Sequence, residues 1–460
     1  VGSEMCIRDS RLYACTDAAG QALLYRSRSR AAPFLLEVSC DPARLGLTGY
    51  PAARRYAAVP LCQHLLGYLD GTGHGAAGLE KALDTVLSGT GENSSLVCAV
   101  TAQGTLRTGE APRLLQADSG ALGVQLAISR PVQRAVEAVA ASTITNGCIL
   151  VLDTATAAVR ASVSVPCYDP ERLADSLQAE NSPFLNRALQ SYAVGSVFKP
   201  VLAAAALEAG LAPEYDCNGA VVVDGQIFRC AGGVPHGEVD LSAALAKSCN
   251  GYFIRLGQQL GAESLLDAAK AFGFGQSLPL AEGLAAEAGQ LPAPQELAQS
   301  GQLANFSFGQ GSLLAAPMQV AALFNTIAAD GVYRSPYVLQ ATLDETTGQP
   351  VETLSHPRGR RVISAQNAAL LRAMLVQVVQ QGTAQDAAGL SGGAGGKTGT
   401  AQTGQFTPEG TERCNLWFAG FWPAEKPRYT IVVLQDGAVH TAYSGAAIFA
   451  QVCNALEAAG

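Results

Sequence analysis

Three short segments of this 460-residue chain carry residue types that can act together on a carbonyl compound. In the first, residues 195–200, Ser196 stands three positions before Lys199. Because Pro200 is acceptable only in the first turn of a helix, we expect Ser196 at the helix N-terminus, with Lys199 one turn along on the same face. A hydroxyl there, beside an amine that apolar neighbours desolvate, is what an activated serine requires. For this pattern alone, an N-cap serine followed by a surface lysine is the commoner explanation.

The second segment, residues 247–251, lies where a helical stretch meets a turn and contains Ser248 and Asn250. Side chains two positions apart in an extended or looped segment point the same way, so this hydroxyl and this amide are expected to face one cleft. The hydroxyl can relay a proton and the amide can position a substrate carbonyl. Taken singly, the segment is more simply a helix-end cap. Cys249, on the opposite side of the backbone, is expected to be shielded and unreactive.

The third segment, residues 395–402, reads Gly-Gly-Lys-Thr-Gly-Thr-Ala-Gln. As a strand, it places Lys397 and Gly399 on one face and Thr398 and Thr400 on the other. Glycine at the edge of a sheet leaves room for another backbone to approach. An extended peptide could therefore add there as an extra strand, with the lysine supplying positive charge for a terminal carboxylate.

Two alternatives exist for this third segment. A phosphate-binding loop is the weaker one, because Ser391 occupies the position of its leading glycine and Gly399 interrupts the helix that the motif requires. A glycine-rich β-turn with an exposed lysine is the other. Neither alternative accounts for the two preceding segments.

The elements that position these segments indicate an α+β fold with an antiparallel sheet flanked by helices. Helical spacing over 131–141 is followed by strand-like residues over 148–165, so a domain is expected to begin near Asn146. Helices grouped before sequential strands favour the antiparallel arrangement. The later helical stretches are 197–209, 241–260, 315–329 and 365–380, the strands are 397–402, 416–422 and 429–435, and a last helix starts at Gly445.

The length and composition describe a globular protein of two or three domains. With 48% hydrophobic and 15% charged residues, neither a disordered chain nor a coiled coil fits. The net charge of −8 and the lack of a basic run exclude nucleic acid as an expected partner. No uninterrupted apolar run is long enough to span a membrane, and residues 1–10 resemble an artefact rather than an authentic N-terminus.

The twelve cysteines include no Cys-x-x-Cys pair, which argues against a zinc ribbon or a thioredoxin-type site. No metal or cofactor is predicted. Cys217 and Cys230 flank a strand-like run over 221–228, where a hairpin would bring them together. A disulfide and two inert thiols are both open at this point.

Together, Ser-x-x-Lys, Ser-x-Asn and Lys-Thr-Gly in this order form the signature of penicillin-binding proteins and serine β-lactamases. The chain resembles the class B penicillin-binding proteins, the monofunctional peptidoglycan transpeptidases, over almost its whole length. The segment 217–230 and Cys249 within Ser-Cys-Asn resemble the Firmicutes members, sporulation-type proteins included. Other similar segments are 78–80, 87–91, 186–188, 236–237, 308–311 and 417–421.

This resemblance implies a mechanism in which Ser196 attacks the carbonyl between the two D-alanines of a stem peptide. Unprotonated Lys199 takes the serine proton. The backbone N–H groups of Ser196 and Thr400 form the oxyanion hole, and Ser248 returns the proton to the departing D-alanine. An amine from a neighbouring stem peptide then takes the acyl group.

The same resemblance assigns substrate-binding roles. Asn250 holds the acyl-donor peptide, while Lys397 with Thr398 and Thr400, around Gly399, binds the terminal carboxylate. β-Lactams are mistaken for the donor and leave a slow acyl-enzyme. A cell-wall glycosyltransferase is an expected protein partner.

The resemblance also implies the domain organisation and the location. Residues 11–112 form a non-catalytic dimerisation or pedestal domain of α+β type, 113–145 a connector, and 146–456 the transpeptidase domain. The protein is expected at the extracytoplasmic face of the cell membrane, anchored by an N-terminal helix missing from this sequence.

Three other functions remain open at this point. A D,D-carboxypeptidase differs only in using water as the acceptor. A β-lactamase-like hydrolase of class A type would need a Glu-x-x-Leu-Asn segment between Ser248 and Lys397, and none occurs. A non-catalytic cell-wall scaffold is disfavoured by the complete set of Ser196, Lys199, Ser248 and Lys397.

Overall fold

The structure, a computed structural model, describes residues 12–27, 36, 38–45, 55–57, 59–91, 95–103, 107, 109–110, 112–115 and 119–459. Its contacts divide the chain into two compact units. One comprises Val1–Ala57 and Ser88–Ala121, and the other comprises Ala58–Leu87 and Leu122–Gly460. All three motif segments lie in the second unit.

Among its described residues, the smaller unit contains four elements with given bounds. They are α2 (Ala18–Ser27), η1 (Pro42–Leu45), and the antiparallel pair β1 (Ser95–Val97) and β2 (Arg113–Leu115).

Residues 58–87 group with the larger unit. The reason is hydrophobic contact, because Cys62, Leu65 and Leu79 are buried in the main core. These residues form α3 (Gln63–Leu66), α4 (Gly78–Ala82) and α5 (Asp84–Ser88).

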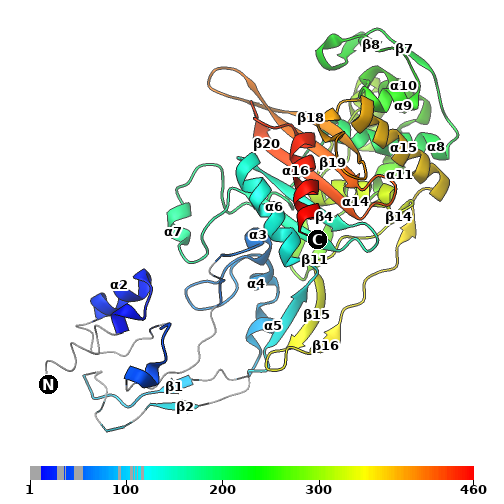
Figure 1. Ribbon diagram of the computed structural model, residues 1–460. Helices are drawn as coiled ribbons and strands as arrows, with labels where there is room; N and C mark the ends of the chain where they lie inside the picture. The colour runs from blue at the N-terminus through cyan, green and yellow to red at the C-terminus, as the bar shows by residue number, and fades with distance from the viewer. Residues whose placement is uncertain are drawn as a thin grey trace. The chain divides into compact units, whose positions relative to one another are not determined.

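The larger unit is built on a five-stranded antiparallel sheet in the order β18-β19-β20-β4-β5 (Figure 1). Strands β4 and β20 are apolar along most of their length and almost wholly buried, because helices cover both faces of the sheet. Strand β18 forms one edge. The predicted antiparallel sheet flanked by helices is confirmed. The strands are β18 (Gly395–Phe406), β19 (Glu412–Trp422), β20 (Tyr429–Ala438), β4 (Gly147–Asp153) and β5 (Val159–Val165).

Two groups of helices pack on this sheet. Helices α6 (Arg130–Thr143) and α16 (Gly445–Ala458) contact each other and the sheet, and lie side by side in Figure 1. Helix α14 (Pro317–Ala328), whose 12 residues are all buried, packs on β4, β19 and β20. It also contacts α15 (Ala365–Gln381), which in turn contacts α8 (Lys199–Glu208).

The prediction of one helical stretch over 241–260 is wrong, because the structure has two helices there. Helix α9 (Leu241–Ala246) ends before a turn, and α10 (Asn250–Leu260) begins after it. Ser248 has a left-handed φ of +54°, which a continuous helix cannot contain. The Cys249 sulfur then accepts the N–H of Tyr252 and caps α10. The expected junction of helix and turn at the second motif is present.

A flap made of residues 215–239 lies beside this turn. Strand β7 (Tyr215–Cys217) pairs with β10 (Gly237–Val239), and the strand-like run over 221–228 lies in a hairpin of β8 (Ala220–Val223) and β9 (Gln226–Arg229). Cys217 and Cys230 are brought together, with their sulfurs 3.7 Å apart, and both are free thiols.

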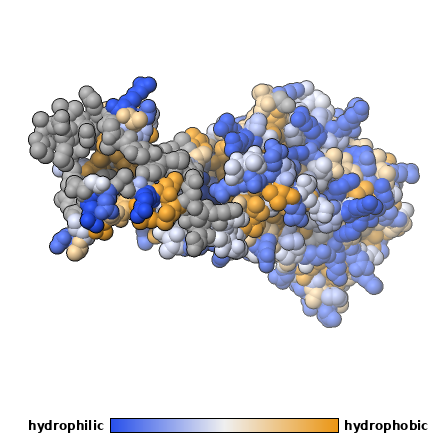
Figure 2. Space-filling model, turned by 90° about the horizontal axis from the view of Figure 1, so that it is seen from below, coloured by the Kyte–Doolittle hydropathy of each residue, from blue (hydrophilic) through white to orange (hydrophobic). Residues whose placement is uncertain are grey.

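The remaining elements complete the surface of the larger unit. The face in Figure 2 is mainly hydrophilic there, with scattered hydrophobic residues. Among the described residues, no helix combines the length and apolar content needed to cross a bilayer. These elements are β3 (Leu122–Leu126), α7 (Leu173–Ser176), β6 (Tyr192–Ala193), η3 (Ala231–Gly233), α11 (Ala262–Ala271), β11 (Leu278–Ala281), β12 (Leu284–Ala286), α12 (Pro294–Leu297), α13 (Ser300–Ser307), β13 (Leu314–Ala315), β14 (Val332–Tyr333), β15 (Leu339–Asp344), β16 (Pro350–Thr353), β17 (Arg360–Arg361) and η4 (Gln385–Ala387).

Candidate active site

Ser196 lies in a short 3-10 turn, η2 (Gly195–Phe198), that leads directly into α8. Pro200 occupies the first turn of α8, as predicted. Gly195 has a φ of +65°, and a Cβ on it would approach the Thr400 carbonyl oxygen to 2.6 Å, so only glycine fits. The turn that carries the serine is therefore held close to strand β18.

Strand β18 approaches the serine turn closely because Gly399 has no side chain. A Cβ there would lie 3.0 Å from Val197 Cγ1 and 3.1 Å from the Val197 amide nitrogen. The first and third motifs are thus adjacent in space. Along β18, Lys397 and Gly399 are buried, whereas Thr398 is half-buried and Thr400 exposed, which confirms the predicted alternation.

The Lys199 side chain joins the first motif to the second. Its amine is completely buried and donates to the Ser248 carbonyl oxygen at 2.7 Å and to the Ser248 hydroxyl at 3.1 Å. It also donates to Asn250 Oδ1 at 2.7 Å and lies 5.5 Å from the centre of the Phe253 ring. Ser248 and Asn250 therefore face the same group, as their spacing predicted.

Burial lowers the pKa of Lys199 far enough for its amine to act as a base. Removal from water lowers the pKa of its amine from its ordinary value to about 7, and the nearby thiols Cys249 and Cys230 act weakly in the opposite direction. At neutral pH, a large fraction of the side chain is therefore an unprotonated amine. This meets the requirement for accepting the proton of a serine hydroxyl.

Lys397 is completely buried, so the alternative of an exposed lysine on a glycine-rich β-turn is wrong. Burial, and then the positive charge of Lys199, lower the pKa of Lys397 well below its ordinary value, so the two lysines lie within electrostatic reach of each other. Its amine donates to the Thr398 carbonyl oxygen at 3.1 Å and approaches the Thr398 hydroxyl at 3.4 Å. A substrate group would reach this lysine only from the edge of β18.

Two further side chains touch the third motif and were not singled out individually from the sequence. The Thr383 hydroxyl lies 2.6 Å from the Thr398 hydroxyl, and Gln310 Nε2 approaches the Thr400 carbonyl oxygen at 3.4 Å. Gln310 lies in segment 308–311, which resembles the family as a whole segment and gave no role to this residue by itself. No local signal identified Thr383.

The assembled groups suit acyl transfer through the Ser196 hydroxyl. Ser196 is partly exposed, and among the described residues no hydrogen bond of its hydroxyl is present. Its turn leads into α8, which carries the Lys199 amine, and lies against the edge strand β18, where an extended ligand can add as a further strand. Catalytic hydrogen bonds are often long before substrate binds, so the informative feature is that Ser196 and the buried base Lys199 lie one turn apart on the same segment.

One group of metal-ligating side chains is present in the described part of the chain. It consists of Cys217, Cys230, His236 and Cys249, and it lies behind the turn that carries Ser248. The sequence did not point to this group, because it contains no Cys-x-x-Cys pair.

Known proteins resemble this chain in both sequence and structure. A family model described as the penicillin binding protein transpeptidase domain matches residues 147–456. Peptidoglycan D,D-transpeptidase PbpA of Mycolicibacterium smegmatis is 32% identical, with 96% of this chain and 87% of that protein covered. Stage V sporulation protein D of Bacillus subtilis is 29% identical over 87% of this chain, which spans 62% of that protein's length.

Solved structures have the same fold. The D,D-transpeptidase domain of a peptidoglycan glycosyltransferase from Eggerthella lenta has a TM-score of 0.74 and 25% identity, covering 89% of this chain and 93% of its own. The penicillin G acyl-enzyme complex of penicillin-binding protein A from M. tuberculosis has a TM-score of 0.69 and 26% identity, covering 86% and 91%.

Proposed function

The chain belongs to the penicillin-binding protein transpeptidase family, and we propose that Ser196 is the residue through which it forms its acyl-enzyme. The protein is a serine D,D-transpeptidase that acts on peptidoglycan stem peptides and is acylated by β-lactams. The observation that carries the assignment of Ser196 is the buried Lys199 amine one turn away, held between Ser248 and Asn250.

The first step is attack of the Ser196 hydroxyl oxygen on the carbonyl carbon between the two terminal D-alanines. The hydroxyl proton passes to neutral Lys199 as the C–O bond forms. The backbone N–H groups of Ser196 and Thr400 would hold the resulting oxyanion, and such a donor usually contributes about 3 kcal/mol. The contact between the Ser196 turn and β18 supports this pairing, because it brings the two backbones together.

The second step releases D-alanine. The C–N bond breaks, and the leaving amine receives the proton that Lys199 had taken, relayed by the Ser248 hydroxyl. The 3.1 Å contact between the Lys199 amine and this hydroxyl supports the relay. The acceptor amine then attacks the ester carbon and gives a proton to Lys199. The bond between this carbon and the Ser196 oxygen breaks, and Lys199 passes the proton to that oxygen.

Substrate recognition is proposed along the edge of β18. The donor peptide would lie antiparallel to this strand, with its carboxylate beside the hydroxyls of Thr398 and Thr400 and near Lys397. Asn250 would hold the donor amide by exchanging one of its present partners, the Lys199 amine or the Arg229 carbonyl oxygen. Gly399 keeps the strand free of a side chain at this point.

The location and the protein partners are proposed from the family. The protein would act at the extracytoplasmic face of the cell membrane, with residues 11–112 as a non-catalytic pedestal and 146–456 as the transpeptidase domain. A cell-wall glycosyltransferase would supply the glycan strands that it cross-links.

The rate of acylation is expected to rise with pH. Below its pKa of about 7, Lys199 is protonated and cannot accept the serine proton, so the rate should fall about tenfold per unit below about pH 6 and level off above about pH 8. The groups that face this amine are Lys397 on β18 and the thiols Cys249 and Cys230. Stopped-flow acylation by a chromogenic β-lactam measures the profile. A rate that stays constant across this range would contradict the role of Lys199.

A stem-peptide analogue ending in D-Ala-D-Ala, incubated with an amine acceptor, distinguishes transpeptidation from hydrolysis. We expect the peptide–acceptor adduct and one equivalent of D-alanine, both detected by mass spectrometry. The same mixture with a protein already acylated by penicillin is the control and should form neither. Release of D-alanine with no adduct at any acceptor concentration would favour a carboxypeptidase.

A further inference from the structure

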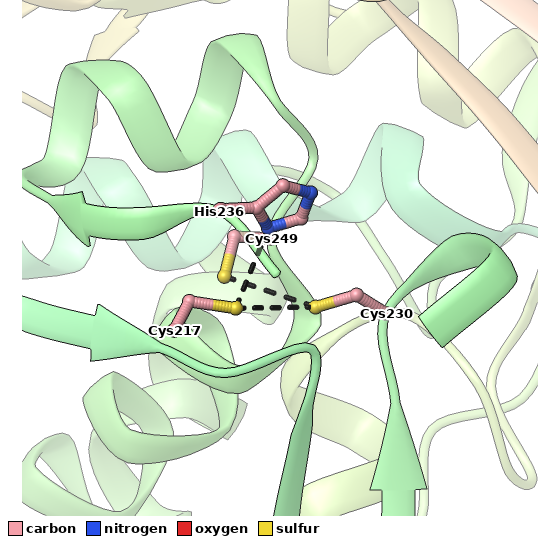
Figure 3. A group of neighbouring side chains, drawn as sticks. All are labelled: Cys217, Cys230, His236 and Cys249. Carbon is pink, nitrogen blue, oxygen red and sulfur yellow. Dashed lines mark hydrogen bonds between the residues drawn. The ribbon is translucent and has the colours of Figure 1, made fainter. Parts of the chain in front are cut away.

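Four side chains from separate segments converge behind the second motif. The ligand atoms of Cys217, Cys230, His236 and Cys249 all lie within 4.8 Å of one another (Figure 3). The three cysteines are buried, and His236 is partly exposed. None of them belongs to the proposed acyl-transfer machinery.

Three of the six distances between the ligand atoms match those around a tetrahedral metal ion. The Cys230 sulfur lies 3.7 Å from that of Cys217 and 3.9 Å from that of Cys249, and His236 Nδ1 lies 3.5 Å from the Cys217 sulfur. With Zn–S bonds of about 2.3 Å and Zn–N bonds of about 2.0–2.1 Å, tetrahedral ligand atoms stand about 3.8 Å (sulfur to sulfur) and about 3.6 Å (sulfur to nitrogen) apart. We propose that this Cys₃His cluster is a structural zinc site.

The backbone holds the four donors in place independently of any ion. Strand pairing sets Cys217 opposite Gly237, and the His236 N–H donates to the Cys217 carbonyl oxygen at 3.0 Å. The Cys249 N–H donates to the carbonyl oxygen of Ala244, in α9, at 2.9 Å. The cage is therefore largely formed by the fold, so binding a metal ion orders few additional groups.

Zinc binds cysteine as the thiolate, so the cysteines of the cluster must lose their protons on binding. Zinc binding would release these thiol protons to solvent as the Zn–S bonds form.

The donor set favours zinc over the alternatives. Soft thiolates with one imidazole suit zinc, whereas magnesium and calcium require oxygen ligands. A disulfide would use only two of the three sulfurs and leave the third cysteine and His236 outside the bond. Four protein ligands leave no open position for water, which makes the site structural rather than catalytic.

The proposed ion would stabilise the turn that holds the catalytic base. Cys249 stands between Ser248 and Asn250, which both bind the Lys199 amine. Asn250 Nδ2 also donates to the carbonyl oxygen of Arg229, the neighbour of Cys230, at 2.9 Å. Zinc would therefore tie the flap to this turn and act as a positioning element for Ser248 and Asn250.

The full chain, isolated under reducing conditions, loaded with Zn²⁺ and desalted, should retain one zinc per chain by elemental analysis. With Co²⁺ in its place, sulfur-to-cobalt charge transfer and intense visible bands should report a tetrahedral thiolate site. Cys217→Ser and His236→Ala should weaken zinc binding at least about tenfold in a chelator competition. Cys167→Ser, which alters an exposed thiol outside the cluster, should leave it unchanged.

Folding is checked by circular dichroism, and the half-exposed position of His236 makes His236→Ala the variant most certain to fold. The proposal is overturned if folded wild type retains no zinc, if His236→Ala binds it as tightly as wild type, or if a disulfide within the cluster forms and persists in the reduced, zinc-loaded protein. If the acyl-enzyme assignment is wrong instead, the result will differ: the wild type will bind zinc, but penicillin will not label it.

Discussion

Replacing Ser196 with alanine is expected to abolish covalent labelling by a fluorescent penicillin without unfolding the protein. The substitution removes the oxygen that forms the ester, so the labelling rate should fall at least about 10⁴-fold. The fold should persist because the side chain is partly exposed and its hydroxyl has no hydrogen bond within the described structure. We expect the free energy of unfolding to change by less than about 0.5 kcal/mol.

Gel fluorescence and intact mass report the label, and thermal unfolding reports the fold. Ser142→Ala, which alters an exposed serine on α6, is the matched control and should label as wild type does. Labelling that persists in Ser196→Ala would mean that another serine is the nucleophile.

Replacing Lys199 with methionine is expected to slow acylation about 10²–10⁴-fold, the usual contribution of a positioned base. Methionine fills a similar volume beside Phe253 but cannot take a proton. It also leaves the Ser248 carbonyl oxygen and Asn250 Oδ1 without their donor, at a cost of about 1–3 kcal/mol for each group that stays buried. The loss of rate should therefore accompany a measurable fall in the melting temperature.

A second variant tests whether Lys199 acts as a base or only through its positive charge. Lys199→Arg keeps the charge but does not lose its proton at neutral pH, so it should also acylate slowly. Lys270→Met, at an exposed lysine on α11, is the control and should behave as wild type. Wild-type acylation by Lys199→Arg would show that the side chain acts only through its charge. Pre-steady-state kinetics with a chromogenic β-lactam provide the rates.

Local signals accounted for much of the fold. Helical spacing at 131–141, Pro200 at the start of a helix, and strands around 397–402 all depend on residues within a few positions of one another, and each is present. The helical stretch predicted over 241–260 is broken at Ser248, where a left-handed residue presents its carbonyl oxygen to the Lys199 amine, far away in the sequence.

By itself, the sequence determined the order of the three motifs, the type of the main elements and the family, because these depend on residue identity and short-range spacing. Tertiary structure alone decided that Lys199 and Lys397 are buried near each other, since desolvation depends on what packs around an amine. It also decided that Cys217, Cys230, His236 and Cys249 meet. Their spacing of Cys-x12-Cys-x5-His-x12-Cys becomes a four-ligand cage only when strand pairing brings β7 beside β10 and the turn before α10 closes against them.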